Sequence, residues 1–150
     1  PTPFDLFIRR FLPHTWFKNR REAYTLYNML NERVDAPNFL GCFMFFRREA
    51  LEHIKEKRDG LEEYFDERFF LYLEDTDITR RMHRFFPTVF VPEVSITHLH
   101  RRASYHSLTL LLVHIISSCK YFNKWGWFRD AQRDSFNDLD SMSVMQRIGR

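Results

Sequence analysis

The sequence is short of the features that mark several classes of protein. Its 150 residues include only two cysteines, Cys42 and Cys119, which are far apart in the chain. Such sparse use of cysteine indicates free thiols and a reducing compartment, so we expect a cytoplasmic protein. The first residues form no charged and apolar leader, and we expect no secretory signal peptide. The chain starts abruptly and has only four glycines, which favours a piece of a longer protein.

A strong charge of one sign is also lacking. The formal net charge is +3 and the isoelectric point is near 9.0. This mild basicity falls short of a dedicated nucleic-acid-binding protein and suits an anionic partner, such as a phosphate-bearing substrate, an acidic membrane surface or RNA. We predict no nucleic-acid partner, and RNA binding by the basic aromatic arm at 7–21 is the weaker alternative.

Aromatic residues, by contrast, are abundant. The chain has 17 Phe, 6 Tyr and 3 Trp, and 44% of its residues are apolar. Such residues fill cores, but they also form platforms for sugars and bases, so both uses stay open. The length suits a single domain of ordinary size. We predict one domain over 1–129 and a polar tail, poorly ordered or loosely helical, over 130–150.

The first half of the chain suggests helices around one strand. Residues 1–17 show no clear periodicity and predict a loop or irregular arm. Apolar residues at helical spacing predict a helix from Asn19 to about Glu32. The aromatic run 39–46 predicts a buried strand, in which Gly41 marks the close approach of a ligand or another backbone. A second helix is predicted over 47–57, ended by Gly60.

The second half suggests two helices and two short strands. A helix ending before Pro87 would bury Ile78, Met82 and Phe85, keep its arginines mostly off that face, and pair Asp77 with Arg81 on its surface. Residues 88–92 and 94–98 predict strands. Helical spacing over 105–122 predicts an amphipathic helix, whose apolar run of about ten residues is too short to span a bilayer.

The end of this last helix is basic and aromatic. The residues concerned are Lys120, Lys124, Trp125, Trp127 and Arg129. Such a set suits peripheral contact with a membrane interface, here the inner face of the membrane. A core-packed helix with a solvated end is the other interpretation.

An acidic stretch at 65–77 carries the strongest chemical signal. It sets five carboxylates among aromatic residues and leucines. Carboxylates this close in an apolar setting cost desolvation and repel one another, so a fold that keeps them usually uses them. We expect Glu74, Asp75 and Asp77 to lie at the edge of a sugar-binding cleft, whereas Asp66 and Glu67 suit a turn. The apolar residues of the stretch should pack the corner beneath this site, namely Phe65, Phe69, Phe70, Leu71 and Leu73. The alternative is a solvated helix start, which the helix dipole favours.

Several segments together resemble one enzyme family. Residues 65–81 read FDERFFLYLEDTDITRR, which resembles the signature of family 2 glycosyltransferases, in particular the rhamnosyltransferase-like enzymes of bacterial surface polysaccharides. The flanking segments FLGCFMFFRREA at 39–50 and VPEVSITH at 91–98 resemble further motifs of the family. Ser118 with Lys120 to Lys124 is similar to its following helix. The likeness covers about residues 7–127.

The resemblance implies an α/β protein with a GT-A fold, of which this chain would be the C-terminal, acceptor-side half. No Asp-x-Asp motif precedes the Glu74–Asp77 cluster, so the nucleotide-binding half would be missing. We therefore expect a partial GT-A fold, with a short mixed sheet flanked by helices, that is inactive alone. The implied reaction moves a sugar from a nucleotide-sugar donor to a polysaccharide or lipid-linked acceptor.

The resemblance also assigns roles to residues. Asp75 would be the catalytic base that takes the proton of the acceptor hydroxyl. Glu74 and Asp77 would hold acceptor hydroxyls, or fix Asp75 through hydrogen bonds with Arg81. His98 would bind a divalent ion, Mn²⁺ or Mg²⁺, shared with the missing half.

Two further groups would contact the substrate. Gly41 and Cys42 stand where the family has Gly-Ala, beside the acceptor. A polar loop contains Arg101, Arg102 and Ser104, which suit phosphates because arginine grips them with two hydrogen bonds; a flexible surface loop is the alternative.

Two other possibilities concern binding and not catalysis. A non-catalytic module that binds glycans or acidic partners fits the missing Asp-x-Asp motif. In addition, an exposed edge of the predicted strand at 39–46 would invite pairing with a second copy of the chain, so a homodimer is expected.

Overall fold

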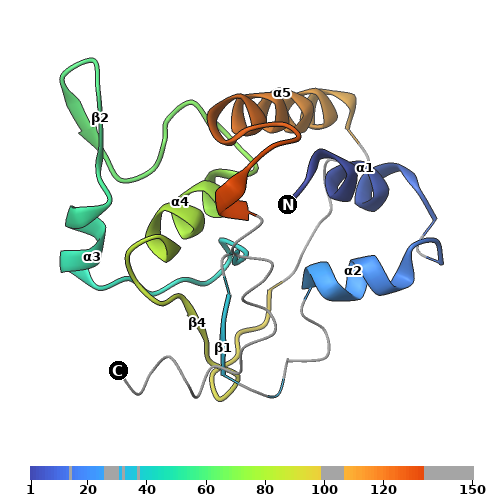
Figure 1. Ribbon diagram of the computed structural model, residues 1–150, viewed down its shortest axis with the longest axis horizontal. Helices are drawn as coiled ribbons and strands as arrows, with labels where there is room; N and C mark the ends of the chain where they lie inside the picture. Colours follow the sequence, from blue (N-terminus) through green and yellow to red (C-terminus); the bar gives the residue numbers. More distant parts are fainter. Residues whose placement is uncertain (14, 26–30, 32, 37, 99–106, 134–150) are drawn as a thin grey trace. The chain divides into compact units, whose positions relative to one another are not determined.

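The structure is a computed structural model that describes residues 1–13, 15–25, 31, 33–36, 38–98 and 107–133 (Figure 1). The chain divides into two compact units. The first unit is built from 1–35, 89–94 and the residues from 125 onward, and the second from 36–88 and 95–124. The described elements are helices and two small antiparallel sheets. The general α/β class is therefore confirmed, whereas a mixed sheet is not found in the part of the chain that the structure describes.

Helix α1, Pro3–Phe11, replaces the loop predicted at the N-terminus. Its start is a capping box: the Asp5 amide donates to Thr2 Oγ1 at 3.1 Å, and the Thr2 amide donates to Asp5 Oδ2 at 2.7 Å. Pro3 at the first helical position needs no hydrogen-bond partner for its nitrogen. The prediction failed because it relied on periodicity and overlooked this cap, which is visible in the sequence.

The remainder of the first unit is small. Helix α2, Lys18–Thr25, confirms the start of the predicted helix, whose last part lies outside the described residues. It is tied to α1 by an ion pair of 2.6 Å between Arg20 and Asp5. Strand β1, Val34–Asp35, pairs antiparallel with β4, Val89–Phe90. The strand predicted over 88–92 is thus reduced to two residues, and the one predicted over 94–98 is absent.

The described beginning of the predicted tail is packed. Asp130 and Arg133 are buried, and the Arg133 amide donates to Asp130 Oδ1 at 3.1 Å. Residues 134–150 lie outside the described part of the chain, so the polar tail stays a prediction.

In the second unit, the segment 39–46 is not a strand. It is an irregular loop with a turn at Gly41 and Cys42, and it exposes Leu40 and 87% of Phe45. Apolar composition alone suggested burial, but the Gly41 amide is bonded to a side chain of α4 instead of a neighbouring strand. Because this segment forms no strand, it offers no strand edge for the predicted pairing with a second copy of the chain.

A short helix and a hairpin follow. Helix α3, Arg48–His53, ends earlier than predicted. Strand β2, Glu56–Arg58, then pairs antiparallel with β3, Leu61–Glu63. The turn residues Asp59 and Gly60 have φ values of 50° and 83°, the left-handed pair typical of a type I′ turn. Gly60 therefore turns a hairpin and does not cap a helix.

Helix α4, Glu74–His83, carries the core of this unit. Ile78 and Met82 pack with Ala50 of α3 and with Ile54, which follows that helix. This confirms two of the three predicted core positions. Phe85, the third, is 55% exposed. The basic side of the helix was also misjudged, since Arg80 and Arg81 are both buried.

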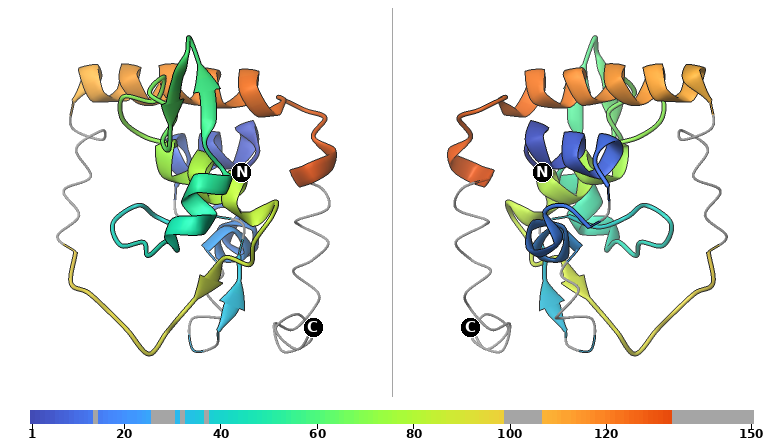
Figure 2. Two further views of the ribbon diagram at one scale, coloured as in Figure 1. Left: turned by 90° about the vertical axis from the view of Figure 1, so that its left-hand side faces the viewer. Right: turned by 90° about the vertical axis from the view of Figure 1, so that its right-hand side faces the viewer.

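Helix α5, Leu108–Trp125, confirms the long helix predicted near the end of the chain (Figure 2). Its buried residues are Ser117, Tyr121 and Phe122, towards its C-terminal end. The leucines and isoleucines that were expected to be core are largely exposed, including 81% of Leu108. Among the described residues, no helix combines the length and apolarity needed to cross a bilayer.

One face of α5 holds the loop that leads into α4. Ser117 Oγ donates to Leu71 O at 2.7 Å, and Lys120 Nζ donates to Arg68 O at 2.8 Å. The two residues before α4, Tyr72 and Leu73, have φ values of 69° and 67°. Such left-handed backbone is costly for residues with large side chains and persists only when its surroundings impose it. The bonds from α5 supply that constraint.

A set of seven charged side chains, here called the ion cluster, joins these elements. Its members are Glu56, Arg58, Asp66, Arg68, Asp77, Arg81 and Lys124. The Lys124 ammonium lies 2.7 Å from Glu56 Oε2, 3.0 Å from Asp66 Oδ2 and 2.9 Å from Asp77 Oδ1. The side chains of Asp66 and Asp77 are fully buried. One lysine thus connects α5 with β2, the loop and α4.

The arginines of the ion cluster complete its charge balance. Arg81 pairs with Asp77 at 2.9 Å and also donates to Ile54 O at 2.8 Å and Tyr64 O at 2.6 Å. Burial alone raises the pKa of Asp66, but hydrogen bonds from Arg68, Arg58 and Lys124 outweigh it and hold that pKa well below its ordinary value. The predicted Asp77–Arg81 pair is confirmed, but it is buried and not on the surface. Asp66 begins a turn, as predicted, because its carbonyl accepts from the Phe69 amide at 2.9 Å. Its buried side chain has in addition a place in the ion cluster that was not predicted.

Replacing Lys124 by methionine should destabilise the protein strongly. The substitution keeps most of the side-chain length but leaves three carboxylates without their shared ammonium, so we expect a loss of about 3 kcal/mol in the free energy of unfolding. Urea denaturation measures it. Lys57→Met, at a position that is 78% exposed, is the control and should change stability by less than about 0.5 kcal/mol. Equal losses in both variants would contradict the role given to Lys124.

Candidate functional site

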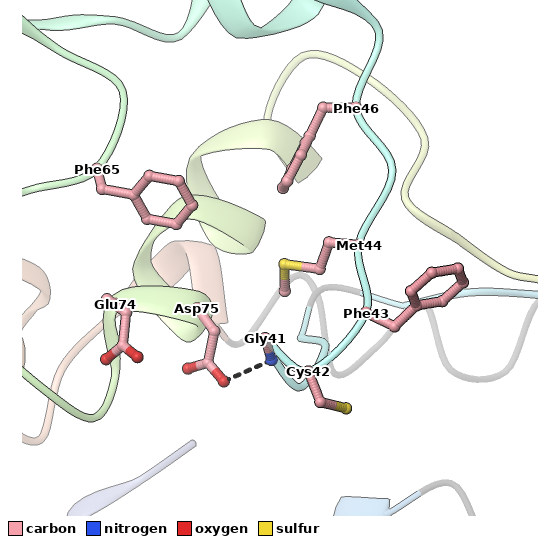
Figure 3. A pocket seen from close by; sticks show the side chains of 8 residues that line it. All are labelled: Gly41, Cys42, Phe43, Met44, Phe46, Phe65, Glu74 and Asp75. Carbon is pink, nitrogen blue, oxygen red and sulfur yellow. Dashed lines mark hydrogen bonds between the residues drawn. The ribbon is translucent and has the colours of Figure 1, made fainter. Parts of the chain in front are cut away.

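A pocket opens beside the N-terminus of α4 in the second unit (Figure 3). Its volume is about 490 Å³, within the usual range for small-molecule sites. The lining residues are Gly41, Cys42, Phe43, Met44, Phe46, Phe65, Glu74 and Asp75. Four residues predicted for the site from the sequence, namely Gly41, Cys42, Glu74 and Asp75, therefore lie together.

Asp75 is held in one orientation by backbone amides. Its Oδ2 accepts a hydrogen bond from the Gly41 amide at 2.8 Å, and its Oδ1 accepts one from the Thr76 amide at 2.7 Å. The carboxylate lies in the first turn of α4, where the helix dipole favours a negative charge. Oδ1 also accepts from the Thr76 hydroxyl at 3.3 Å. Because each carboxylate oxygen has about two acceptor positions, room for a further donor is left at Oδ2.

Gly41 permits this approach because it lacks a side chain. A Cβ atom at this position would lie 3.0 Å from Asp75 Cβ and 3.4 Å from Asp75 Oδ2. That is tighter than ordinary van der Waals contact. A glycine inside an aromatic segment was the sequence signal for a close approach, and the structure identifies its partner as the side chain of Asp75.

Glu74 has a different environment from its neighbour. Its Oε2 atom is buried and has no hydrogen bond from the described residues. Burial raises the pKa of the Glu74 carboxyl; a bond from its own backbone amide opposes the shift, and the charge of Asp75 adds to it. A partly buried carboxyl group with a raised pKa beside a pocket is a feature common in functional sites.

The rest of the pocket wall is apolar. Phe65 lies near the first turn of α4, Phe46 lies farther along the helix, and Met44 and Phe43 extend from the loop that approaches it (Figure 3). None of the described residues that line the pocket is cationic. Aromatic rings beside carboxylates suit a ligand with an apolar face and hydroxyl donors, whereas a phosphate would lack a counter-charge.

Other predicted site residues lie elsewhere. Asp77 and Arg81 belong to the ion cluster and do not line the pocket. His98 is exposed, in an irregular segment. Arg101, Arg102 and Ser104 fall outside the described residues, so the predicted phosphate loop stays a prediction.

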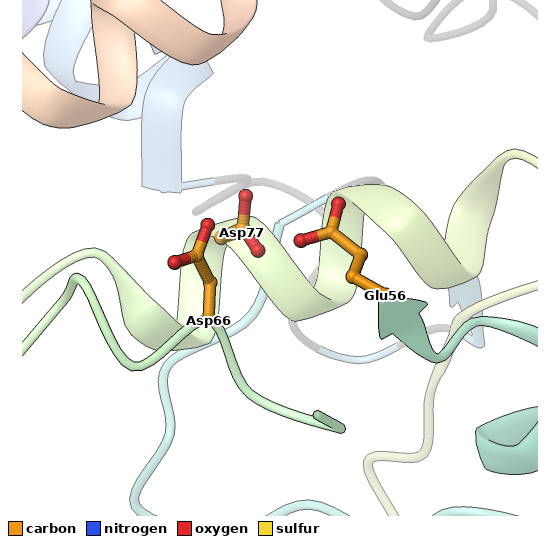
Figure 4. Close-up of side chains that lie close together, drawn as sticks. All are labelled: Glu56, Asp66 and Asp77. Carbon is orange, nitrogen blue, oxygen red and sulfur yellow. The ribbon is translucent and has the colours of Figure 1, made fainter. Parts of the chain in front are cut away.

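Three carboxylates of the ion cluster have the spacing of a metal site. One oxygen from each of Glu56, Asp66 and Asp77 lies within 4.8 Å of the others (Figure 4). However, the Lys124 ammonium already contacts all three, and arginines pair with Asp66 and Asp77. A divalent ion would have to displace this lysine. These residues therefore do not fit a metal, and the predicted Mn²⁺ or Mg²⁺ at His98 stays a prediction.

Sequence reasoning missed part of the pocket wall. Phe43, Met44 and Phe46 were assigned to the interior of a strand, and Phe65 to the packing beneath the site. Phe65 is 46% exposed and Phe70, from the same packing prediction, is 85% exposed, whereas Phe69 and Leu73 are buried as expected. The available signal was the density of aromatic residues around Gly41, which indicates ring platforms as readily as a strand.

Comparisons with known proteins identify no relative of this chain. No family model, no curated protein and no solved structure matches the chain. The interpretation of the pocket therefore depends on its own residues and on their resemblance to a sequence motif.

Replacing Gly41 by alanine should disturb the pocket. The added methyl group would push the loop away from Asp75 and weaken the bond from the amide at position 41, at a cost of about 1 kcal/mol. Amide hydrogen exchange at residue 41 should become faster. Cys42→Ala removes an exposed thiol and is the matched control, with exchange at position 41 unchanged. Unchanged exchange in the alanine variant at 41 would contradict the proposed contact.

Replacing Glu74 by glutamine should stabilise the protein in a pH-dependent way. Folding raises the pKa of Glu74 above its ordinary value of 4.5, so its ionisation lowers stability as the pH rises through the folded-state pKa. The glutamine variant avoids this cost. Its advantage in urea denaturation should be present at pH 7 and disappear below about pH 4, where both states bind the proton.

The exposed residue Glu67 offers a control for this experiment. Glu67→Gln makes the same chemical change in the same acidic stretch and should give no comparable gain at pH 7. A gain for Glu74→Gln that persists unchanged at low pH would show that packing, and not ionisation, explains it.

Proposed function

We propose that the chain is the acceptor-side part of an inverting glycosyltransferase with a GT-A type fold. The observation that carries the proposal is the position of Asp75, which lines an aromatic pocket and is oriented by the Gly41 amide at 2.8 Å. The motif that resembles family 2 glycosyltransferases points to the same residue as the base. The donor would be a nucleotide-sugar, and the acceptor a polysaccharide or a lipid-linked sugar.

In this reaction Asp75 would take a proton from the acceptor. Its fixed carboxylate accepts the proton of one acceptor hydroxyl while that oxygen attacks the anomeric carbon of the donor sugar. The bond from the anomeric carbon to the diphosphate breaks, and the diphosphate leaves with the electron pair. The amides of Gly41 and Thr76 orient the base, which brings proton transfer and attack into one geometry.

Glu74 would bind the acceptor next to the base. A carboxyl group with a raised pKa can donate a hydrogen bond in its protonated form and accept one when ionised. Phe46 and Phe65 would cover the apolar face of the sugar ring. Asp77 and Arg81 would act indirectly. Asp77 accepts a hydrogen bond from Arg81, which donates to the carbonyls of Ile54 and Tyr64 and so fixes the position of α4.

The donor would be bound elsewhere in a complete enzyme. A pocket without cationic lining among the described residues gives no support to diphosphate binding at this position. A Mn²⁺ or Mg²⁺ ion would neutralise the leaving diphosphate on the donor side. His98 is the residue of this chain proposed to reach it.

A non-catalytic glycan-binding module is the second candidate function. It is favoured by the two hydrogen bonds that Asp75 already accepts from backbone amides. A binding site needs only a carboxylate held in a fixed position to accept hydrogen bonds from a ligand. An acidic partner does not suit this pocket, because the carboxylates of Glu74 and Asp75 would repel it.

Replacing Asp75 by asparagine separates the two functions. In the full-length protein, assayed with radiolabelled UDP-, GDP- and dTDP-sugars, the variant should lose about 10²- to 10⁴-fold in kcat because the base is gone. Asparagine keeps an oxygen for the Gly41 amide but turns an NH2 donor towards the Thr76 amide. Acceptor binding is therefore measured alongside, and its retention shows that the pocket persists. Asp59→Asn, in the exposed hairpin turn, is the control and should retain full activity.

Other outcomes of this assay are equally informative. Transfer that survives in the Asp75 variant would remove the role of base from this residue. Acceptor binding without transfer in the unchanged full-length protein, tested with every donor of the panel, would favour the binding module.

A further inference from the structure

Helix α1 presents an aromatic face to solvent. Phe4, Phe7 and Phe11 recur at spacings of three and four, so they share one side of the helix. Each is about half exposed, between 47% and 54%, whereas Ile8 beside them is buried. Three exposed phenylalanines on one short helix are unusual for a surface that contacts only water.

The following turn extends this surface. Trp16 is 57% exposed, and Phe17 contacts Phe4 edge-on with ring centroids 5.8 Å apart. Phe7 and Phe11 are also in contact, at 5.2 Å. We call Phe4, Phe7, Phe11, Trp16 and Phe17 the aromatic face. It belongs entirely to the first unit.

The net charge of the chain lies in the segment that carries the aromatic face. Residues 1–25 contain five basic side chains, Arg9, Arg10, Lys18, Arg20 and Arg21, and two acidic ones, Asp5 and Glu22. The remaining residues carry 18 basic and 18 acidic side chains. The whole formal charge of +3 therefore resides in this first segment.

Two guanidinium groups lie directly against the exposed rings. Arg20 is over the ring of Phe4 at 5.2 Å, and Arg10 is over that of Phe11 at 5.6 Å. Side chains arranged in this way can place a ring among acyl chains and a guanidinium at the depth of the lipid phosphates. With nine residues, α1 has a length of about 14 Å, suited to lying in the interface.

We propose that the aromatic face of α1 binds the surface of an anionic lipid bilayer, with the helix in the plane of the interface. The partner is identified by two matched features, apolar rings for the acyl boundary and net positive charge for acidic headgroups. RNA fits less well, because base stacking needs open ring faces and these rings pack against one another and against arginines.

The location differs from the one predicted from the sequence. That prediction placed membrane contact at residues 120–129, with Lys124 among the basic groups. Lys124 is only 12% exposed and is bound by three carboxylates of the ion cluster. The proposal for α1 is independent of sugar transfer and can fail or succeed without it.

Vesicle co-sedimentation of the full chain tests the proposal. Vesicles of phosphatidylcholine with about one third phosphatidylglycerol should bind the protein, and pure phosphatidylcholine should bind it roughly 100-fold more weakly, as three net charges imply. The variant Phe7→Ser/Phe11→Ser should lose at least about tenfold in partitioning onto the anionic vesicles. Circular dichroism checks that it remains folded.

A matched double variant controls for general loss of apolar surface. Phe45→Ser/Phe70→Ser removes two phenylalanines that are 87% and 85% exposed and should bind like the unchanged protein. As a second measurement, lipids brominated on their acyl chains should quench the fluorescence of the unchanged protein, and less so in Trp16→Phe.

Several results would overturn the proposal. Equal binding to both kinds of vesicle, no binding to either, or equal losses in the two double variants would each exclude it. Displacement of the protein from vesicles by poly(U), with a steep salt dependence that the Phe7→Ser/Phe11→Ser variant retains, would assign the surface to RNA.

Discussion

The second unit depends on one ammonium group shared by three carboxylates. Lys124 near the end of α5 contacts Glu56 of β2, Asp66 of the loop before α4, and Asp77 of α4. Burying so many charges is costly, and the cost is offset only when every partner is present and well placed. Such an arrangement contributes less to net stability than to geometry, because a shift of any one element would leave a buried charge unpaired.

That geometry explains how the pocket can exist. The chain reaches α4 through two left-handed residues, Tyr72 and Leu73, an arrangement that free peptide would avoid. Bonds from Ser117 and Lys120 of α5 fix the carbonyls just before them. Glu74 and Asp75 therefore emerge from a constrained corner, at the helix end where negative charge is favoured. The strained backbone thus lies in the residues that lead into the site, and the contacts of the ion cluster and α5 maintain its conformation.

Local patterns in the sequence predicted what local physics decides. Helical spacing identified α5 and the burial of Ile78 and Met82, and the carboxylate pair of the pocket was found from its apolar setting. The T-P-x-D cap of α1 and the Asp-Gly turn of the hairpin were equally local, and were missed because weight was given to periodicity. Contacts between residues distant in the sequence could not be predicted. The charge of Lys124 does not show that it binds three carboxylates, and the aromatic run 39–46 does not show that its Gly41 amide bonds to Asp75 in place of a neighbouring strand.

The sign of the neighbouring charge separates the two proposed uses of exposed aromatic residues in this chain. In the pocket, rings stand beside carboxyl groups, which accept hydroxyl protons and repel phosphates. On α1, rings stand beside guanidinium groups, whose positive charge attracts phosphates. The same abundant residue type thus supplies apolar contact at both surfaces, and the charge next to it decides the class of ligand. In a chain with 17 phenylalanines, the charged side chains next to the exposed rings therefore distinguish one binding surface from the other.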